Sequence, residues 1–137
     1  MIERGLFFFI GEKGASANYV HVDDVVEALV LCGTHKSARG KTFNISDFCT
    51  MEDFVKMISS ELAINAPSIR LPILLVKFLA IVVAFIPKVH LTQARVDALI
   101  NRSVYGVGSI KSELNYIYKV GIKKGVKDLV AEYKRIK

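Results

Sequence analysis

The sequence predicts an α/β protein with few, short strands and several helices. Short runs of aromatic and β-branched residues alternate with longer segments whose apolar residues repeat at helical spacing. Of the 137 residues, 52% are hydrophobic and 23% are charged, which excludes disordered and collagen-like proteins and allows a real core. This length suits one modest domain, so we expect a single domain over residues 1–137.

Short apolar runs bounded by glycine or polar residues predict the strands. We expect them at Leu6–Ile10, Tyr19–Val22, Lys41–Ser46 and Ser68–Leu71. The polar segment Gly11–Asn18 predicts a loop, and Asp47–Thr50 predicts a turn. Three or four strands of this length make a poor independent sheet, so we expect their edges and apolar faces to seek a partner.

Capping residues and helical spacing predict the helices. Asp23 and Asp24 offer N-cap oxygens to a helix over Val25–Cys32, which Gly33 would end. That helix is apolar nearly all round, which favours burial on more than one side. Thr50, with an aspartate three residues later, predicts the cap of the next helix. Further helices are expected within Leu71–Pro87, Thr92–Ile100, Ser109–Asn115 and Ile122–Ile136.

One very apolar segment and one strongly basic segment are candidate surfaces for binding a partner. Leu71–Pro87 is the most apolar segment, but it is at the short limit for a membrane span and carries Lys77 near its middle. It therefore favours a buried or partner-facing helix, with a peripheral membrane contact as the alternative. The net charge of +6 is concentrated in the last nineteen residues, and a solvated helix face is the simplest interpretation of this excess.

The motifs that usually carry cofactor binding or catalysis are absent from the sequence. It contains no glycine-rich dinucleotide fingerprint after a strand, no phosphate-binding P-loop and no HExxH. Cys32 and Cys49 lack zinc-ligand spacing, so we expect no metal site. Tyr133 and Lys137 have YxxxK spacing but lie in the closing amphipathic helix, and we assign no catalytic residue.

The cluster of His21, Asp23 and Asp24 has two interpretations. On a strand, His21 and Asp23 would share a face, and the three side chains could form a metal or acid/base group. Two carboxylates at a strand-to-helix junction are more simply a helix cap and a favourable pair at the positive end of the helix dipole. We favour the structural interpretation.

Four segments, in order along nearly the whole chain, resemble one known family. They are Tyr19–Ala28 (YVHVDDVVEA), Gly40–Thr50 (GKTFNISDFCT), Ile110–Tyr116 (IKSELNY) and Gly125–Tyr133. They resemble the C-terminal part of the extended short-chain dehydrogenases/reductases, the NAD-dependent sugar-nucleotide epimerase/dehydratase family. The resemblance implies a C-terminal fragment of a Rossmann-type enzyme, its substrate-binding lobe. The NAD-binding Rossmann half and the catalytic Tyr-Lys pair would be absent.

The resemblance also implies a ligand and its contacts. The ligand would be a nucleoside diphosphate sugar, with NAD(P) serving the full-length enzyme and no cofactor bound by this chain alone. We expect the substrate-binding residues to be Asn18, Tyr19, Arg95 and Arg102. A guanidinium fork pairs bidentately with phosphate oxygens, so Arg95 or Arg102 would contact the diphosphate. Asn115 stands where the family has glycine, and asparagine tolerates left-handed backbone.

Partners and location follow from the same resemblance. The chain would be inactive alone, would pair with its missing Rossmann half and would form a homo-oligomer, because unpaired edges invite association. No signal peptide is evident, which favours the cytoplasm, and the family's link is to polysaccharide biosynthesis. The alternative is a non-enzymatic module that self-associates or binds membranes peripherally through Leu71–Pro87 and the basic C-terminal helix. No nucleic-acid-binding motif is present, so we expect no nucleic-acid partner.

Overall fold

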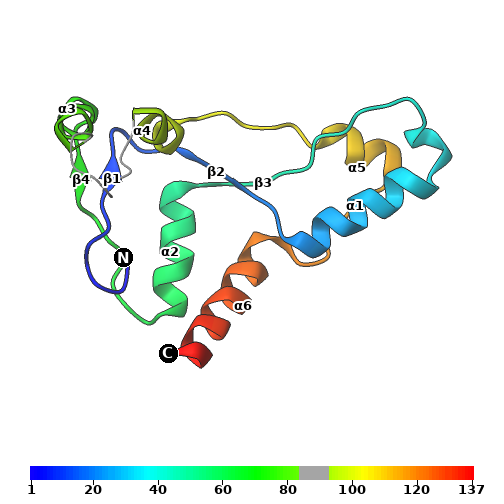
Figure 1. Ribbon diagram of the computed structural model, residues 1–137. Coiled ribbons are helices and arrows are strands. Elements are labelled where there is room, and N and C mark those ends of the chain that lie inside the picture. The colour runs from blue at the N-terminus through cyan, green and yellow to red at the C-terminus, as the bar shows by residue number, and fades with distance from the viewer. Residues whose placement is uncertain (84–92) are drawn as a thin grey trace. The chain divides into compact units, whose positions relative to one another are not determined.

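The computed structural model describes residues 1–83 and 93–137, apart from the side chains of Val82, Val83, Gln93 and Arg95. Its elements, in chain order, are β1 (Phe9–Ile10), β2 (Ser16–Tyr19), α1 (Val22–Thr34), the 3-10 helix η1 (Lys36–Ala38), β3 (Asp47–Thr50), α2 (Met51–Glu61), β4 (Arg70–Leu71), α3 (Ile73–Val83), α4 (Gln93–Ile100), α5 (Gly108–Leu114) and α6 (Gly121–Ile136) (Figure 1). This is the α/β class with short strands and several helices that the sequence predicts.

The chain divides into two compact units, and each is built from two separated stretches. Unit 1 comprises Met1–Ser16 and Thr50–Ser103, and unit 2 comprises Ala17–Cys49 and Val104–Lys137. Each unit therefore depends on residues that are distant in sequence. The expectation of a single domain over residues 1–137 stays a prediction.

Unit 1 is organised around the parallel pair β1 and β4. Phe9 lies opposite Arg70 in this pair, and Ile10 lies opposite Leu71. A small core forms beside the pair from α3 and α4. Its buried residues are Val76, Ala80 and Val96, and Ile10 and Leu71 pack against them. The strands thus place the start of α3 next to the loop that follows β1.

Unit 2 has its own core between α1 and α5. The buried members of this core are Ala28, Ala38, Ile110, Leu114 and Tyr116. A second two-stranded sheet pairs β2 with β3. The end of α5 is set by Asn115, whose φ of 53° and ψ of 34° are left-handed, so asparagine serves here as a helix C-cap.

The helix caps confirm one prediction and correct another. The Thr50 hydroxyl accepts a hydrogen bond from the backbone N–H of Asp53, as the sequence predicts for the start of α2. The cap of α1, however, is His21, whose Nδ1 accepts from the N–H of Asp23. Asp23 and Asp24 therefore lie inside the first turn of α1, where their negative charge still favours the helix dipole.

Asp24 instead stabilises the start of a different helix. Its side chain is buried, and its two carboxylate oxygens accept hydrogen bonds from the backbone N–H groups of Lys119, Val120 and Gly121, at 2.5, 2.9 and 2.9 Å. Asp47 accepts from the next N–H, that of Ile122, at 2.6 Å. The first N–H groups of a helix have no partner within it, so these carboxylates cap α6.

All four predicted strands differ from the structure in their bounds, and the fourth is reduced from Ser68–Leu71 to Arg70–Leu71. The first shrinks to Phe9–Ile10, and the second lies at Ser16–Tyr19 because the small residue Ala17, and not the apolar Val20, turns into the interior. The third lies at Asp47–Thr50, where a turn was expected, and not at Lys41–Ser46. At the end of the expected strand, the Ser46 carbonyl accepts a hydrogen bond from the Tyr118 hydroxyl. A side chain therefore occupies a backbone acceptor that a neighbouring strand would otherwise use.

The helix α1 is longer and more exposed than the sequence predicts. It runs to Thr34, with Gly33 inside it and His35 as its C-cap. Burial on more than one side is wrong, because α1 turns Asp24 and Ala28 inward and leaves an apolar stripe in solvent. The residues of this stripe are Val22, Val26, Leu29 and Val30.

The segment Leu71–Pro87 is only partly described. Its residues from Ile73 to Val83 form α3, and residues 84–87 lie outside the described part of the chain. No helix among the described residues is long enough and apolar enough to cross a membrane.

Candidate functional site

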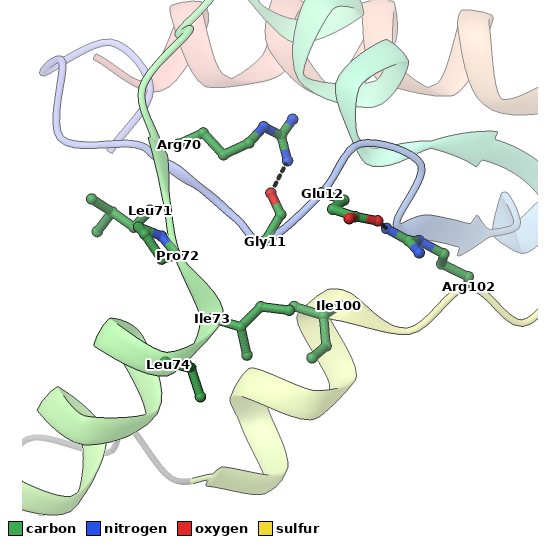
Figure 2. A pocket seen from close by; sticks show the side chains of 9 residues that line it. All are labelled: Gly11, Glu12, Arg70, Leu71, Pro72, Ile73, Leu74, Ile100 and Arg102. Carbon is green, nitrogen blue, oxygen red and sulfur yellow. Dashed lines mark hydrogen bonds and ion pairs between the residues drawn. The ribbon is translucent and has the colours of Figure 1, made fainter.

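Unit 1 contains a cavity of about 720 Å³ at the junction of the loop after β1, the start of α3 and the end of α4. Figure 2 shows the residues that line it, which are Gly11, Glu12, Arg70, Leu71, Pro72, Ile73, Leu74, Ile100 and Arg102. Its volume lies within the range of roughly 300–1,000 Å³ that is typical of small-molecule sites. One part of the lining is apolar, and Glu12, Arg70 and Arg102 supply its charged groups.

Gly11 fixes the position of the polar loop against the apolar wall. Its N–H donates to the carbonyl of Leu71 at 2.9 Å, and its φ is +67°. A Cβ atom at this position would lie 2.6 Å from Cγ1 of Ile73, closer than real Cβ contacts allow. Both the left-handed backbone and the close approach therefore require glycine.

Arg70 is held firmly on one side of the cavity. Its Nη1 donates to the Gly11 carbonyl at 2.7 Å, its Nη2 donates to Oε1 of Glu52 at 2.5 Å, and its guanidinium lies 4.9 Å from the ring centroid of Phe9. The other oxygen of Glu52 accepts from the N–H of Gly14 at 3.2 Å. Arg70 and Glu52 thus fasten the loop to β4 and α2.

The electrostatics of this pair fit a structural role. Burial alone would raise the pKa of Glu52, but the Arg70 guanidinium and the Gly14 N–H outweigh it and hold the pKa below its ordinary value of 4.5. The side chains of Arg70 and Glu52 are both three-quarters buried, so the ion pair is partly desolvated. An anionic ligand could bind Arg70 only by displacing the Glu52 carboxylate from it.

Arg102 is held much more loosely. Its Nη2 donates to Glu12 at 3.3 Å and to the carbonyl of Lys13 at 3.2 Å. The side chain of Arg102 is 52% exposed and that of Glu12 is 86% exposed. An exposed ion pair of this kind contributes about 0–1 kcal/mol. Arg102 can therefore exchange Glu12 for the anionic group of a ligand at little cost.

The structure places the four expected substrate-binding residues differently. Arg102 lines the cavity, whereas Arg95 lies in α4 with its side chain outside the described residues. Asn18 and Tyr19 belong to β2 in unit 2 and are not among the residues that line this cavity. Asn18 accepts a hydrogen bond from the Ser46 hydroxyl at 3.2 Å. Their roles in substrate binding stay predictions.

Sequence reasoning missed Arg70. It is the only charged residue between Glu61 and Lys77, and it stands directly before the apolar segment, a position that could have marked it. Its partner Glu52 lies 18 residues earlier, on another element, and no local spacing joins the two residues.

Cofactor and metal chemistry find little support in the described residues. Gly11 and Gly14 follow β1, but the chain then enters β2, so this loop does not lead directly into a helix as a dinucleotide-binding loop does. The N–H of Gly14 already donates to a carboxylate. Phe9–Tyr19 therefore lacks the strand-loop-helix arrangement of a dinucleotide-binding fingerprint. Among the residues described, no cluster of three His, Cys, Asp or Glu side chains could hold a metal ion.

Comparison with known proteins bears on the fold. No protein-family model and no curated protein matches the sequence. The crystal structure of gox2253 is similar, with a TM-score of 0.63 and 20% identity over 89% of this chain and 38% of that one. UDP-glucuronic acid 4-epimerase from Bacillus cereus, in complex with NAD, has a TM-score of 0.56 and 14% identity over 92% of this chain and 34% of that one.

The chain shares the fold of part of these proteins. It spans little more than a third of their length. At such low identity the likeness concerns the fold alone, and it agrees with the partial Rossmann-type fold that the resemblance of the four sequence segments implies.

Proposed function

We propose that this chain forms the C-terminal, substrate-binding portion of an NAD-dependent nucleotide-sugar epimerase or dehydratase. Two findings support the proposal: the ordered resemblance of four sequence segments, and a fold shared with part of an NAD-bound epimerase. The NAD-binding half and the catalytic residues would belong to a separate part of the enzyme, so the chain alone is inactive. A homo-oligomeric state, a cytoplasmic location and a role in polysaccharide biosynthesis belong to the same proposal.

The cavity in unit 1 is the proposed site for the nucleoside diphosphate sugar. The observation that carries this assignment is a half-exposed, weakly paired arginine beside an otherwise largely apolar wall. Arg102 would leave Glu12 and bind the diphosphate bidentately, since a guanidinium matches the geometry of phosphate oxygens. The apolar wall of Pro72, Ile73 and Ile100 would contact the less polar faces of the ligand. Asn18, Tyr19 and Arg95 stay proposed substrate contacts on the family resemblance alone.

Calorimetry on the intact chain tests the proposal. UDP-glucuronic acid is a suitable probe, and the Arg102→Ala variant is compared with Arg4→Ala, which removes an exposed arginine outside the cavity lining. A hydrogen-bonded charge pair contributes about 1.5–3 kcal/mol, so Arg102→Ala should weaken binding roughly 10-fold or more. Arg4→Ala should bind as the wild type does.

Two results would overturn parts of the proposal. Equal binding by Arg102→Ala and the wild type would remove Arg102 from the site, and an absence of nucleotide-sugar binding would remove the site itself. NAD affinity comparable to that of a complete epimerase would contradict the assignment of NAD to the missing half.

A further inference from the structure

Unit 1 contains a second cavity, of about 350 Å³, bounded by the loop after β1, by α2 and by the segment that leads into β4. Among the described residues that line it, only Arg70 also lines the first cavity, the one that contains Arg102. Its volume lies near the lower end of the range of roughly 300–1,000 Å³ that is typical of small-molecule sites. The polar and charged residues of its lining are Lys13, Glu52, Lys56, Ser68 and Arg70.

The two lysines of the second cavity come from segments that are fastened to each other. The Gly14 N–H donates to Oε2 of Glu52 at 3.2 Å, and the N–H of the first residue of α2 donates to the Ala15 carbonyl at 2.8 Å. Lys13 directly precedes this contact, and Lys56 lies about one turn of α2 beyond Glu52. The backbone therefore holds both lysines at one cavity before any ligand arrives.

The charges in the second cavity do not balance. Arg70 and Glu52 pair at 2.5 Å, and the other Glu52 oxygen accepts from the Gly14 N–H, so both oxygens of this carboxylate are engaged. Neither Lys13 nor Lys56 has an ion-pair partner among the residues that the structure describes. Each lysine thus leaves one positive charge uncompensated, and the cavity favours an anion with two negative charges.

The rest of the lining is largely apolar. It consists of Phe9, Val55, Ala66 and Pro67, of which Phe9 and Val55 are buried. A matching ligand therefore needs an apolar body beside its charged end. A phosphate monoester combines the two, because its phosphate group carries about −1.5 to −2 charges at pH 7 and three acceptor oxygens. A carboxylate carries a single charge.

We propose that the second cavity binds a small phosphate monoester. Lys13 and Lys56 would hold the phosphate group, to which the lysine ammonium binds as a point charge. The apolar part of the ester would lie against Val55 and Pro67. This inference goes beyond the nucleotide-sugar proposal and does not depend on it, because it uses Lys13 and Lys56 and not Arg102.

Calorimetric titration of the intact chain with phenyl phosphate, at low ionic strength, tests this inference. Inorganic phosphate and benzoate are the comparison probes, since the first lacks the apolar body and the second carries a single charge. Lys13→Gln and Lys56→Gln each remove one exposed charge from the cavity lining. Lys127→Gln is the matched control, because it makes the same change at an exposed lysine within α6, outside that lining.

We expect phenyl phosphate to bind the wild type more tightly than either comparison probe does. Each cavity variant should weaken its binding roughly 10-fold, as the loss of a charged hydrogen bond implies, and Lys127→Gln should change it less than about 2-fold. Equal affinities of Lys56→Gln and Lys127→Gln would overturn the inference, and so would an absence of phenyl phosphate binding by the wild type. Inorganic phosphate that binds as tightly would overturn the assignment to an ester, and benzoate that does so would overturn the assignment to a doubly charged group.

Discussion

The carboxylate of Asp24 should be the most sensitive single site in unit 2. It is fully buried and accepts three backbone N–H groups at the start of α6. Replacement by asparagine keeps the shape of the side chain but removes the charge. The asparagine amide N–H₂ group would then face backbone N–H groups. An N–H₂ group only donates hydrogen bonds, so it cannot accept from these donors.

The structure sets the size of the expected loss. Hydrogen bonds to a charged group contribute about 1.5–3 kcal/mol, and a buried donor left without a partner costs about 1–3 kcal/mol. A carboxylate at a partly buried helix N-terminus adds up to about 2 kcal/mol. The substituted amide would keep one oxygen as an acceptor, so Asp24→Asn should lower the free energy of unfolding by about 2–4 kcal/mol. The whole stability of such a domain is about 5–15 kcal/mol.

Urea unfolding followed by far-UV circular dichroism measures this loss. Asp23→Asn is the control, because Asp23 is the neighbouring carboxylate, its side chain is 57% exposed, and it lies in the same turn of α1. That substitution should cost at most about 1 kcal/mol, the value of an exposed charge at a helix N-terminus. If the two variants unfold at the same urea concentration, the buried cap does not stabilise unit 2 and the reasoning is wrong.

The same carboxylate predicts an acid dependence. Burial alone would raise the pKa of Asp24, but the N–H groups of Val120, Gly121 and Lys119 outweigh it and hold the pKa below its ordinary value of 3.8. Because the folded-state pKa lies below the unfolded one, the stabilisation is present above about pH 3.9 and is lost as the pH falls through the folded-state value. The difference in stability between wild type and Asp24→Asn should shrink below about pH 4.

Two further predictions concern other sites. Gly11→Ala should destabilise unit 1 more than Gly5→Ala does: their φ values are +67° and +66°, but only at Gly11 would a Cβ clash, with Ile73 at 2.6 Å. The extra cost should be about 1–3 kcal/mol in urea unfolding, and equal losses would contradict the packing account. Tyr116→Phe should cost about 1 kcal/mol, because the buried hydroxyl donates to the Asp24 carbonyl at 3.2 Å. Burial and the Asp24 charge raise the pKa of Tyr116 to about 12, so its stabilisation should be complete below about pH 10 and lost toward pH 12. An ultraviolet tyrosinate titration in which Tyr116→Phe removes no group near 12 would contradict this.

Features set by near neighbours in sequence were predictable. Thr50 caps α2 because its partner Asp53 is three residues away, and Asn115 ends α5 in the left-handed conformation that asparagine tolerates. The apolar spacing of Ile122–Ile136 likewise marks α6, whose bounds differ from the prediction by one residue. In each case the deciding contact lies within one or two turns of helix.

Features set by distant partners were not predictable. Asp24 meets its three N–H donors 95 to 97 positions later in the chain, so its local pattern suggested a cap for α1 and not for α6. The shift of the third strand to Asp47–Thr50 has a similar cause, since Tyr118 engages the Ser46 carbonyl from 72 positions away. The inward turn of the polar Asp24 is also why apolar residues of α1 face solvent.

The candidate site shows the same division. Arg102 was one of two arginines expected to contact the diphosphate, and it lines the cavity, while its part in binding stays a prediction. Arg70 was not found, because its importance depends on Glu52 and Gly11, which other elements supply. Asn18 and Tyr19 belong to unit 2, which begins at Ala17. No change in amino-acid composition marks this boundary in the sequence.

The interleaved architecture has a consequence for biosynthesis. Thr50–Ser103 of unit 1 lies between the two stretches of unit 2, so unit 1 is complete in sequence while the second half of unit 2 is still being translated. Until Gly121 leaves the ribosome, the Asp24 carboxylate lacks the complete set of N–H groups that it accepts from. A nascent chain released early would therefore carry a folded unit 1 beside an unfinished unit 2. Such a product, in which Ala28 of α1 lacks its packing partners Ile110 and Leu114 of α5, is the form that quality-control proteases and chaperones would capture first.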